Sequence, residues 1–329
     1  MIISQTPYRI SLFGGGTDYP DWYLRHGGMV LSTTIDKYIY ISCRQLPPFF
    51  EHNLRLVYSI VETVKSVADI QHPSARNVLE YLGISDGLEI HYDGDLPARS
   101  GMGSSSAFTV GLLRVLYKYK DIPIDVNQLA INALDVEQNI IGECVGSQDQ
   151  INAAYGGFNT IGFNTDGTFT VNPVTISKQR KQQLNDKLML FYTGIVRTAG
   201  TIAGTYVNHL DDKASQLNNI SQLTKEAKMI LQGDGPLDRL GELLHQSWVQ
   251  KRNLSNMVTN ERIDFLYQAG RCAGAIGGKL TGAGGGGMML LYVPEKNQNR
   301  VREALSELLY IPFRFSDEGC RVIFDYVRR

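Results

Sequence analysis

The stretch LPARSGMGSSSA (residues 96–107) decides how the first half of the chain folds. It places a glycine-rich turn and three serines directly before Ser104–Tyr119, a segment whose apolar residues share one face at helical spacing. The free N–H groups and the positive dipole end of such a helix face the turn, so the stretch predicts an anion site. For this run alone, a serine N-cap with a flexible approach is an equally good interpretation.

Glycine is concentrated in three places along the chain. The 33 glycines cluster at residues 14–16, 101–103 and 277–287. Glycine permits positive φ and close approach of backbone N–H groups to a ligand, so the clusters together predict three loops that meet at one anionic group. Taken alone, each cluster is more simply interpreted as an ordinary turn. The chain has no GxxxxGK[ST] loop, and the GxGxxG match at Gly282, Gly284 and Gly287 is followed by too few residues for a dinucleotide-binding domain.

The bulk properties exclude several classes of protein. A length of 329 residues favours two domains that share a cleft, where small ligands tend to bind. The net charge of -1 provides no field that would gather nucleic acid or an anionic membrane. The N-terminus lacks a basic, apolar signal segment, and no apolar run is long enough to cross a bilayer, so we expect a cytoplasmic protein. The cysteines are widely spaced and indicate reduced thiols: Cys43, Cys144, Cys272 and Cys320.

The order of elements predicts an α+β fold in both halves. In the first half we expect strands at residues 35–43 and 88–92 and helices at 104–119 and 127–141. Polar stretches at 164–167 and 177–186 are boundary candidates, and we place the division near Gln183, giving domains 1–183 and 184–329. The second half is predicted to run in the order strand, several helices, strand, strand, helix and strand, as in a split βαβ sheet. The segments are residues 188–192, residues 279–280 leading into 288–293, the helix 297–309 and the last strand 321–327.

Three stretches resemble the ordered motifs of the GHMP kinases, the superfamily of galactokinase, homoserine, mevalonate and phosphomevalonate kinases. They are PYRISLFGGGTDY (residues 7–19), LPARSGMGSSSA (96–107) and KLTGAGGGGMML (279–290). The resemblance spans nearly the whole chain and implies an S5-like N-terminal domain and a ferredoxin-like C-terminal domain. GGGTDYPDWY (14–23) and GSQDQ (146–150) are most similar to D-glycero-D-manno-heptose 7-phosphate kinases, with fucokinases close behind. Galactokinases carry a Glu-His pair where this chain has Gly15 and Gly16, which weakens a galactose assignment.

The resemblance implies that ATP with Mg²⁺ is the phosphoryl donor. By motif position Ser105 would be the hydroxyl near magnesium, and Glu137 matches the metal-binding glutamate of the family. Independently of the family, Glu137 lies on the apolar face of the helix predicted at 127–141, and a buried carboxylate needs a partner such as a metal ion or a cation on the helix flank. The residues expected to bind ATP are Pro97, Ser100, Gly101, Met102, Gly103, Ser104, Ser105 and Ser106.

The resemblance also implies the catalytic pair. Asp149, in the loop VGSQDQ, matches the aspartate that takes the proton of the substrate hydroxyl, either by removing it or by orienting the hydroxyl. Arg9 lies where these kinases keep an arginine beside that aspartate, and it would hold Asp149 ionised. Without the family context, a turn aspartate and an exposed surface arginine are the simpler interpretations.

The substrate is expected to contact the first and third glycine motifs. Asp18 would bind sugar hydroxyls, because a carboxylate can accept two of them at once. Lys251 and Arg252 border the apolar face of a helix, and the resemblance to heptose phosphate kinases favours phosphate recognition there over a solvated helix flank. The full set expected to bind substrate is Gly16, Thr17, Asp18, Tyr19, Lys251, Arg252, Gly282, Gly284 and Gly285.

We therefore expect a kinase that phosphorylates the anomeric hydroxyl of D-glycero-D-manno-heptose 7-phosphate to give the 1,7-bisphosphate. One alternative is a free-sugar kinase, either a fucokinase or galactokinase-like, which Lys251 and Arg252 would distinguish. The other is a non-catalytic protein that senses a sugar and ATP; such a protein could lose Asp149 or Glu137, and the presence of both favours the enzyme. The expected partner is a small-molecule sugar or sugar phosphate. The exact sugar, the anomer and the choice between monomer and homodimer stay open.

Overall fold

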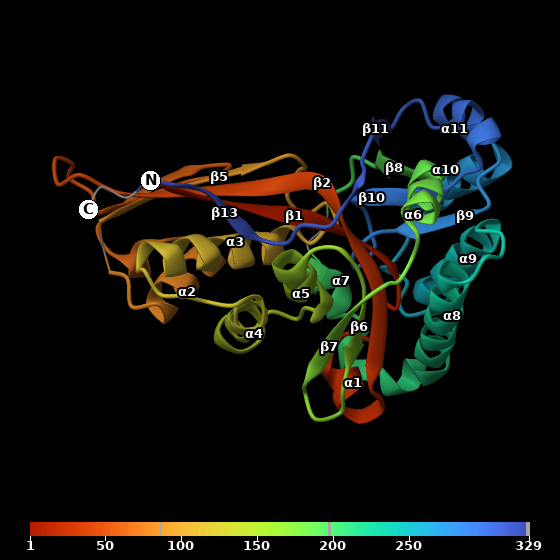
Figure 1. The fold of residues 1–329 in the computed structure, drawn as a ribbon, viewed down its shortest axis with the longest axis horizontal. Helices are drawn as coiled ribbons and strands as arrows, with labels where there is room; N and C mark the ends of the chain where they lie inside the picture. Colours follow the sequence, from red (N-terminus) through yellow and green to blue (C-terminus); the bar gives the residue numbers. More distant parts are fainter. Residues whose placement is uncertain (86, 197–198, 327–329) are drawn as a thin grey trace.

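Two sheets with helices packed against them organise residues 1–85, 87–196 and 199–326, which this computed structural model describes (Figure 1). The strands are β1 (Ile2–Phe13), β2 (Gly28–Gln45), β3 (Leu54–Val57), β4 (Val61–Val64), β5 (Leu88–Gly94), β6 (Phe158–Phe163), β7 (Phe169–Pro173), β8 (Leu188–Tyr192), β9 (Gly277–Leu280), β10 (Met288–Tyr292), β11 (Leu309–Ile311), β12 (Phe315–Ser316) and β13 (Arg321–Asp325). The α-helices are α1 (Pro20–His26), α2 (Pro73–Tyr81), α3 (Ser104–Tyr119), α4 (Val126–Leu134), α5 (Gln148–Tyr155), α6 (Lys178–Asp186), α7 (Ala199–Ala203), α8 (Ala214–Gln232), α9 (Asp238–Arg252), α10 (Glu261–Cys272) and α11 (Gln298–Ala304). Short 3₁₀ turns are η1 (Val67–Asp69), η3 (Val207–His209), η4 (Asp211–Lys213) and η5 (Glu295–Asn297), and η2 (Asp135–Ile140) is π-helical. The α+β class expected from the sequence is confirmed.

The first sheet has the order β13-β1-β2-β5-β3-β4, with β6 and β12 also paired to the long strand β2. Residues Ile39, Ile41 and Cys43 of β2 point inward and are buried, whereas the residues between them are only partly buried. This alternation is what the sequence showed at residues 35–43, and it lets one face of the sheet bury apolar surface under helices α2, α3 and α5 (Figure 1).

Helix α3 packs against β1 and β2 and has the bounds expected from its apolar spacing. Its buried stripe includes Phe108, Leu112 and Leu116, each no more than 4% exposed. The stripe fixes the helix beneath the sheet, so that its first turn lies near the junction with the second sheet. The glycine-rich stretch before α3 therefore lies where residues from both sheets can contact the same ligand.

The second sheet has the order β11-β8-β10-β9, which is the split βαβ layout expected for this half. Alternate residues of β8 belong to different apolar clusters: Leu188 and Leu190 join the core shared with the first sheet, and Met189 and Phe191 pack with α10 and α11. Both faces of this sheet are therefore buried.

The predicted last strand of the second sheet is wrong. We expected residues 321–327 there, but β13 pairs antiparallel with β1 in the first sheet, and β11 takes its place in the second; Val327 lies outside the described residues. The pattern of apolar and polar residues in a strand does not determine which sheet the strand joins, and β1 has an edge available for pairing with β13. The turn at 164–167 joins β6 to β7 within the first sheet. The division near Gln183, which falls inside α6, stays a proposal.

Among the described residues, no helix combines the length and the apolar character that crossing a membrane requires.

Candidate active site

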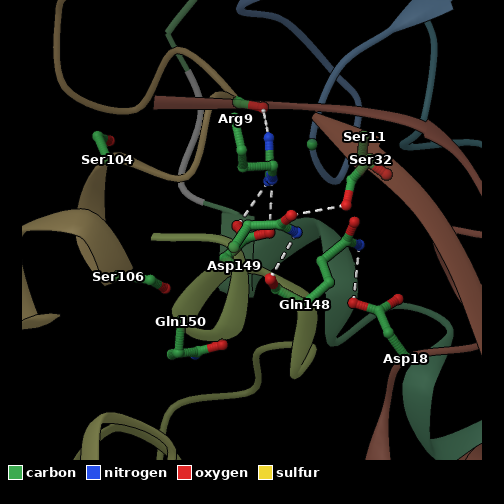
Figure 2. A network of polar contacts seen from close by, with 12 residues as sticks. Arg9, Ser11, Asp18, Ser32, Ser104, Ser106, Gln148, Asp149 and Gln150 are labelled. Atoms are coloured by element: carbon green, nitrogen blue, oxygen red, sulfur yellow. Dashed lines mark hydrogen bonds and ion pairs between the residues drawn. The ribbon is translucent and has the colours of Figure 1, made fainter. Parts of the chain in front are cut away.

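A bidentate ion pair between Arg9 and Asp149 lies at the junction of the two sheets (Figure 2). Arg9 on β1 donates from Nε to Asp149 Oδ1 at 2.6 Å and from Nη2 to Oδ2 at 2.5 Å, while Nη1 donates to the Gly101 carbonyl at 2.8 Å. The Arg9 side chain is almost fully buried, but the Asp149 side chain stays 23% exposed. The predicted catalytic pair is thus brought together with the glycine loop, and its carboxylate remains open to a ligand.

Helix α3 begins without a side-chain cap. Gly103 is its N-cap residue in the left-handed conformation, with φ 77°, and supplies no side-chain cap for the first N–H groups. Ser104 instead accepts from the backbone N–H of Arg99 at 3.2 Å, so the serine N-cap interpretation does not hold. Free N–H groups at a helix start attract anions, which fits a triphosphate at this loop.

The other residues predicted to bind ATP have mixed surroundings. Pro97 is exposed, whereas Met102 is buried and its carbonyl accepts from the Arg9 N–H at 3.2 Å. Ser100 is 1% exposed, and its hydroxyl is among the buried groups for which the described residues provide no partner. The loop thus offers a buried hydroxyl as well as backbone N–H groups.

The third glycine cluster packs backbone to backbone against the loop before α3. A Cβ on Gly282 would lie 2.6 Å from the Gly101 Cα, and the N–H of Met288 donates to the Ser100 carbonyl at 3.0 Å. Only glycine permits this approach, so the cluster joins the two sheets at the site. Gly284 and Gly285 pack against Val258, whose carbonyl accepts from the Gly285 N–H at 2.7 Å. Their predicted contact with substrate stays a prediction.

Glu137 is fully buried on the π-helical turn η2. Its Oε2 accepts from the Ser106 hydroxyl at 2.8 Å and from Gln150 Nε2, and its Oε1 has no partner among the described residues. Burial raises the pKa of this carboxyl to about 7, although the nearby Thr109 hydroxyl and the hydrogen bonds from Ser106 and Gln150 oppose the rise. A buried carboxylate oxygen without a partner, beside a hydroxyl and an amide, fits Mg²⁺, which takes oxygen ligands.

One of the three serines at the start of α3 contacts Glu137. Ser105 is exposed in the first turn of α3, and Ser106 is the residue whose hydroxyl reaches Glu137. Successive helical residues point about 100° apart, so adjacent serines do not face the same carboxylate. The predicted contact of Ser105 with magnesium stays a prediction.

Asp18 lies on the opposite side of Asp149 from the glycine loop (Figure 2). Its Oδ1 accepts from the Gly16 N–H at 2.9 Å and its Oδ2 from Gln148 Nε2 at 2.8 Å. Burial raises the pKa of the Asp18 carboxyl, and the charge of Asp149 acts in the same direction. Two acidic groups therefore border one site.

Thr17 and Tyr19, the neighbours of Asp18, are buried and have local partners. The Thr17 hydroxyl donates to the Gly14 carbonyl at 2.8 Å, and the Tyr19 ring packs edge-on against Tyr206. Both side chains hold the loop that positions Asp18. Their predicted sugar contacts stay predictions.

Lys251 and Arg252 do not converge. Lys251 on α9 is 6% exposed and donates to the Gly282 carbonyl, whereas Arg252 pairs with Asp264 of α10 at 2.7 Å. Burial lowers the pKa of Lys251 to about 8, with the charges of Asp18 and Asp149 opposing the fall. The two cations therefore have different surroundings, and their predicted contact with a substrate phosphate stays a prediction.

Two residues at the site were missed from the sequence. Lys279 is 2% exposed, and its Nζ donates to the carbonyls of Ser11 and Leu12 at 2.9 and 3.2 Å, which ties β9 to β1. Burial holds the pKa of Lys279 well below its usual range. The other residue is Gln148, the donor to Asp18. Both lie inside motifs that were recognised, KLTGAGGGG and GSQDQ, so their place in a motif was the available signal.

Comparisons with known proteins agree with this geometry. The model of the GHMP kinases N terminal domain matches residues 63–157, and that of the GHMP kinases C terminal domain matches residues 227–311. Together the two matches cover more than half of the chain. The chain is 28% identical to a D-glycero-alpha-D-manno-heptose 7-phosphate kinase of Campylobacter jejuni, over 97% of this chain and 98% of that protein.

Further similarities are more distant. The chain is 25% identical to a bifunctional fucokinase/GDP-fucose pyrophosphorylase of Arabidopsis thaliana over 92% of its length, but that match covers 31% of the plant protein. Its fold is similar to the crystal structure of a D-glycero-D-manno-heptose 1-phosphate kinase from Bacteroides thetaiotaomicron, with a TM-score of 0.79, 22% identity and coverage of 99% and 100% of the two chains. A mevalonate kinase structure matches with a TM-score of 0.73 at 19% identity, over 97% of this chain and 100% of that one.

Proposed function

The chain belongs to the GHMP kinases, phosphotransferases that act on hydroxyl groups, and on this premise we propose that its acceptor is D-glycero-D-manno-heptose 7-phosphate. The product would be the 1,7-bisphosphate, formed at the anomeric hydroxyl with ATP as the donor. The observation that carries the proposal is the partly exposed carboxylate of Asp149, held by Arg9 near the start of α3, whose N-cap residue is Gly103. It supports a proton acceptor at Asp149 and a phosphate site at the start of α3.

Each side chain has a proposed task in the transfer. The N–H groups at the start of α3 bind the anionic phosphates, and Arg9 balances charge between them and Asp149. Asp149 accepts a hydrogen bond from the substrate hydroxyl. This bond orients the hydroxyl toward the terminal phosphate of ATP, and Asp149 receives the proton of the hydroxyl. Glu137 and Ser106 would hold Mg²⁺. The ion would neutralise charge that develops on the phosphate oxygens.

A terminal phosphate on the sugar requires a cation at the acceptor site. Lys251 is buried beside Asp18 and Asp149, and its charge interacts with both. Burying a second anion near a nucleotide is costly unless a cation compensates for it, and we assign this task to Lys251. This supports a phosphorylated acceptor, as does the name of the Campylobacter jejuni relative.

Phosphorus NMR of products tests the proposal. The panel offered with MgATP is D-glycero-D-manno-heptose 7-phosphate, the same heptose 1-phosphate, the free heptose, fucose and galactose. We expect the highest kcat/KM for the 7-phosphate, with two sugar phosphorus resonances in the product. A preference for free fucose or galactose would establish the free-sugar kinase instead. Transfer to none of them would favour the sugar and ATP sensor.

Lys251→Ala is expected to raise the KM for heptose 7-phosphate by more than tenfold, because a charge-assisted hydrogen bond contributes roughly 1.5–3 kcal/mol. The KM for MgATP should change little. Arg252→Ala is the matched control, since Arg252 is already paired with Asp264, and it should leave the sugar phosphate KM within about twofold. Steady-state kinetics of both variants measure this. Equal effects of the two substitutions would show that Lys251 does not select the phosphate.

The KM for heptose 7-phosphate should also depend on pH. Lys251 carries its charge below a pKa of about 8 and loses it above, whereas the substrate phosphate is already dianionic above its second pKa of about 6. Raising the pH through 8 should therefore raise the KM in the wild type. The same profile should be flat in Lys251→Ala, which has no amine to titrate. A parallel rise in both proteins would assign the effect to another group.

A further inference from the structure

Two buried polar groups beside Asp18 have no partner among the described residues. They are the hydroxyl of Ser11, on a residue 3% exposed, and the amide oxygen of Gln148, on a residue 8% exposed. Leaving such groups without a hydrogen bond costs free energy, so native proteins rarely do so without a ligand or ordered water that completes them. Figure 2 shows Gln148 next to Asp149 and Asp18, and Ser11 farther from Asp149, beside Ser32.

The orientation of the Gln148 amide is fixed by Asp18. Its Nε2 donates to Asp18 Oδ2 at 2.8 Å, and an ionised carboxylate can only accept. The amide therefore cannot turn over without placing two acceptors against each other, and Oε1 is left free to accept. Ser11 differs, since its hydroxyl can both donate and accept.

Gly15 leaves the space beside these groups open. A Cβ at Gly15 would lie 3.5 Å from the Ser11 hydroxyl and 3.7 Å from Gln148 Nε2, which is ordinary van der Waals contact. The φ of Gly15 lies outside the left-handed region, unlike those of Gly14 and Gly16. An alanine would consequently fit at Gly15 without strain, yet its Cβ would occupy space beside the Ser11 hydroxyl and the Gln148 amide.

We propose that Ser11, Gly15 and Gln148 form a specificity notch that receives one hydroxyl of the sugar, other than the one phosphorylated. A hydroxyl donates one hydrogen bond and accepts others, so it can donate to Gln148 Oε1 and accept from Ser11. A methyl group can make neither hydrogen bond, and a phosphate dianion has no hydrogen to donate to Gln148 Oε1. The notch thus requires an unmodified hydroxyl at this position. The inference rests on the proposed function and specifies the feature of the acceptor that this site recognises, which is one unmodified hydroxyl.

Gly15→Ala and Gln148→Leu test the notch. Each should raise the KM for the sugar by roughly tenfold, the expected loss of one buried hydrogen bond, while the KM for MgATP stays at the wild-type value. Gly235→Ala is the matched control, because a Cβ there meets nothing within 4 Å. Gly15→Ala keeps the bond from Gln148 to Asp18 intact, so it separates the notch from the support of Asp18. Thermal unfolding of each variant verifies that the fold is retained.

Monodeoxy analogues of the accepted sugar identify the hydroxyl. With the wild type, the kcat/KM for one analogue should be about tenfold below that for the parent sugar. With Gln148→Leu, the same analogue and the parent sugar should have equal kcat/KM, because the residue and the hydroxyl form one interaction. The notch is refuted if every analogue lowers kcat/KM, relative to the parent sugar, as much with Gln148→Leu as with the wild type. It is also refuted if Gly15→Ala keeps the wild-type KM for the sugar. If the wild type prefers a free sugar, the proposed function fails, and deoxy analogues of that sugar test the notch in the same way.

Discussion

Asp149→Asn is expected to lower kcat by roughly 10²–10⁴-fold while MgATP still binds. The amide keeps nearly the same shape, but it is a far weaker proton acceptor. It also presents only one oxygen to Arg9, which in the native protein donates to both oxygens of Asp149. The expected loss is therefore in the chemical step and in the placement of the arginine, and not in nucleotide affinity.

Single-turnover rates and calorimetric titration with a nonhydrolysable ATP analogue separate these quantities. Asp234→Asn, the same chemical change on an exposed residue, is the matched control and should behave as the wild type does. A turnover near that of the wild type in Asp149→Asn would mean that the Asp149 carboxylate takes no part in the transfer.

Glu137→Gln is expected to raise the magnesium concentration needed for half-maximal rate by on the order of 10²-fold. The substitution removes the negative charge from a fully buried position, and losing one member of a buried charge pair costs about 2–5 kcal/mol. Because Gln still accepts from Ser106 and Gln150 through its carbonyl oxygen, the fold should persist. Magnesium titrations of the rate and of nucleotide binding measure the effect.

The two serines provide a comparison within the same turn of α3. Ser106→Ala should raise the magnesium requirement more than Ser105→Ala, since only Ser106 reaches Glu137. The reverse order would support the assignment by motif position over the arrangement found here. If the titrations of Glu137→Gln and the wild type overlay, the metal site lies elsewhere.

The sequence was most informative where a local pattern settles the answer. Helix α3 and strand β8 have the bounds that apolar spacing predicted, because both bury one continuous set of residues. The bidentate contact between Arg9 and Asp149 was also expected, although 140 positions separate the two residues. Here the family motifs supplied what local periodicity cannot.

What the sequence left undecided has a different cause, since each case depends on a choice between geometrically equivalent neighbours. Nothing in residues 321–327 states which sheet edge they join. A run of three serines does not state which one faces Glu137, because the π-helical turn at Asp135–Ile140 alters the angle of that carboxylate. Adjacent cations at Lys251 and Arg252 point in different directions on α9, and only the packing against α10 decides which of them reaches the site.

The pairing of β13 with β1 has a consequence for biosynthesis. β1 carries Arg9, but its outer neighbour β13 is made only after the strands of the second sheet, β8 to β11. Until translation reaches residues 321–325, β1 exposes an unpaired backbone edge, which is a surface that other chains can join. The first sheet can therefore be completed only after the second sheet has been synthesised.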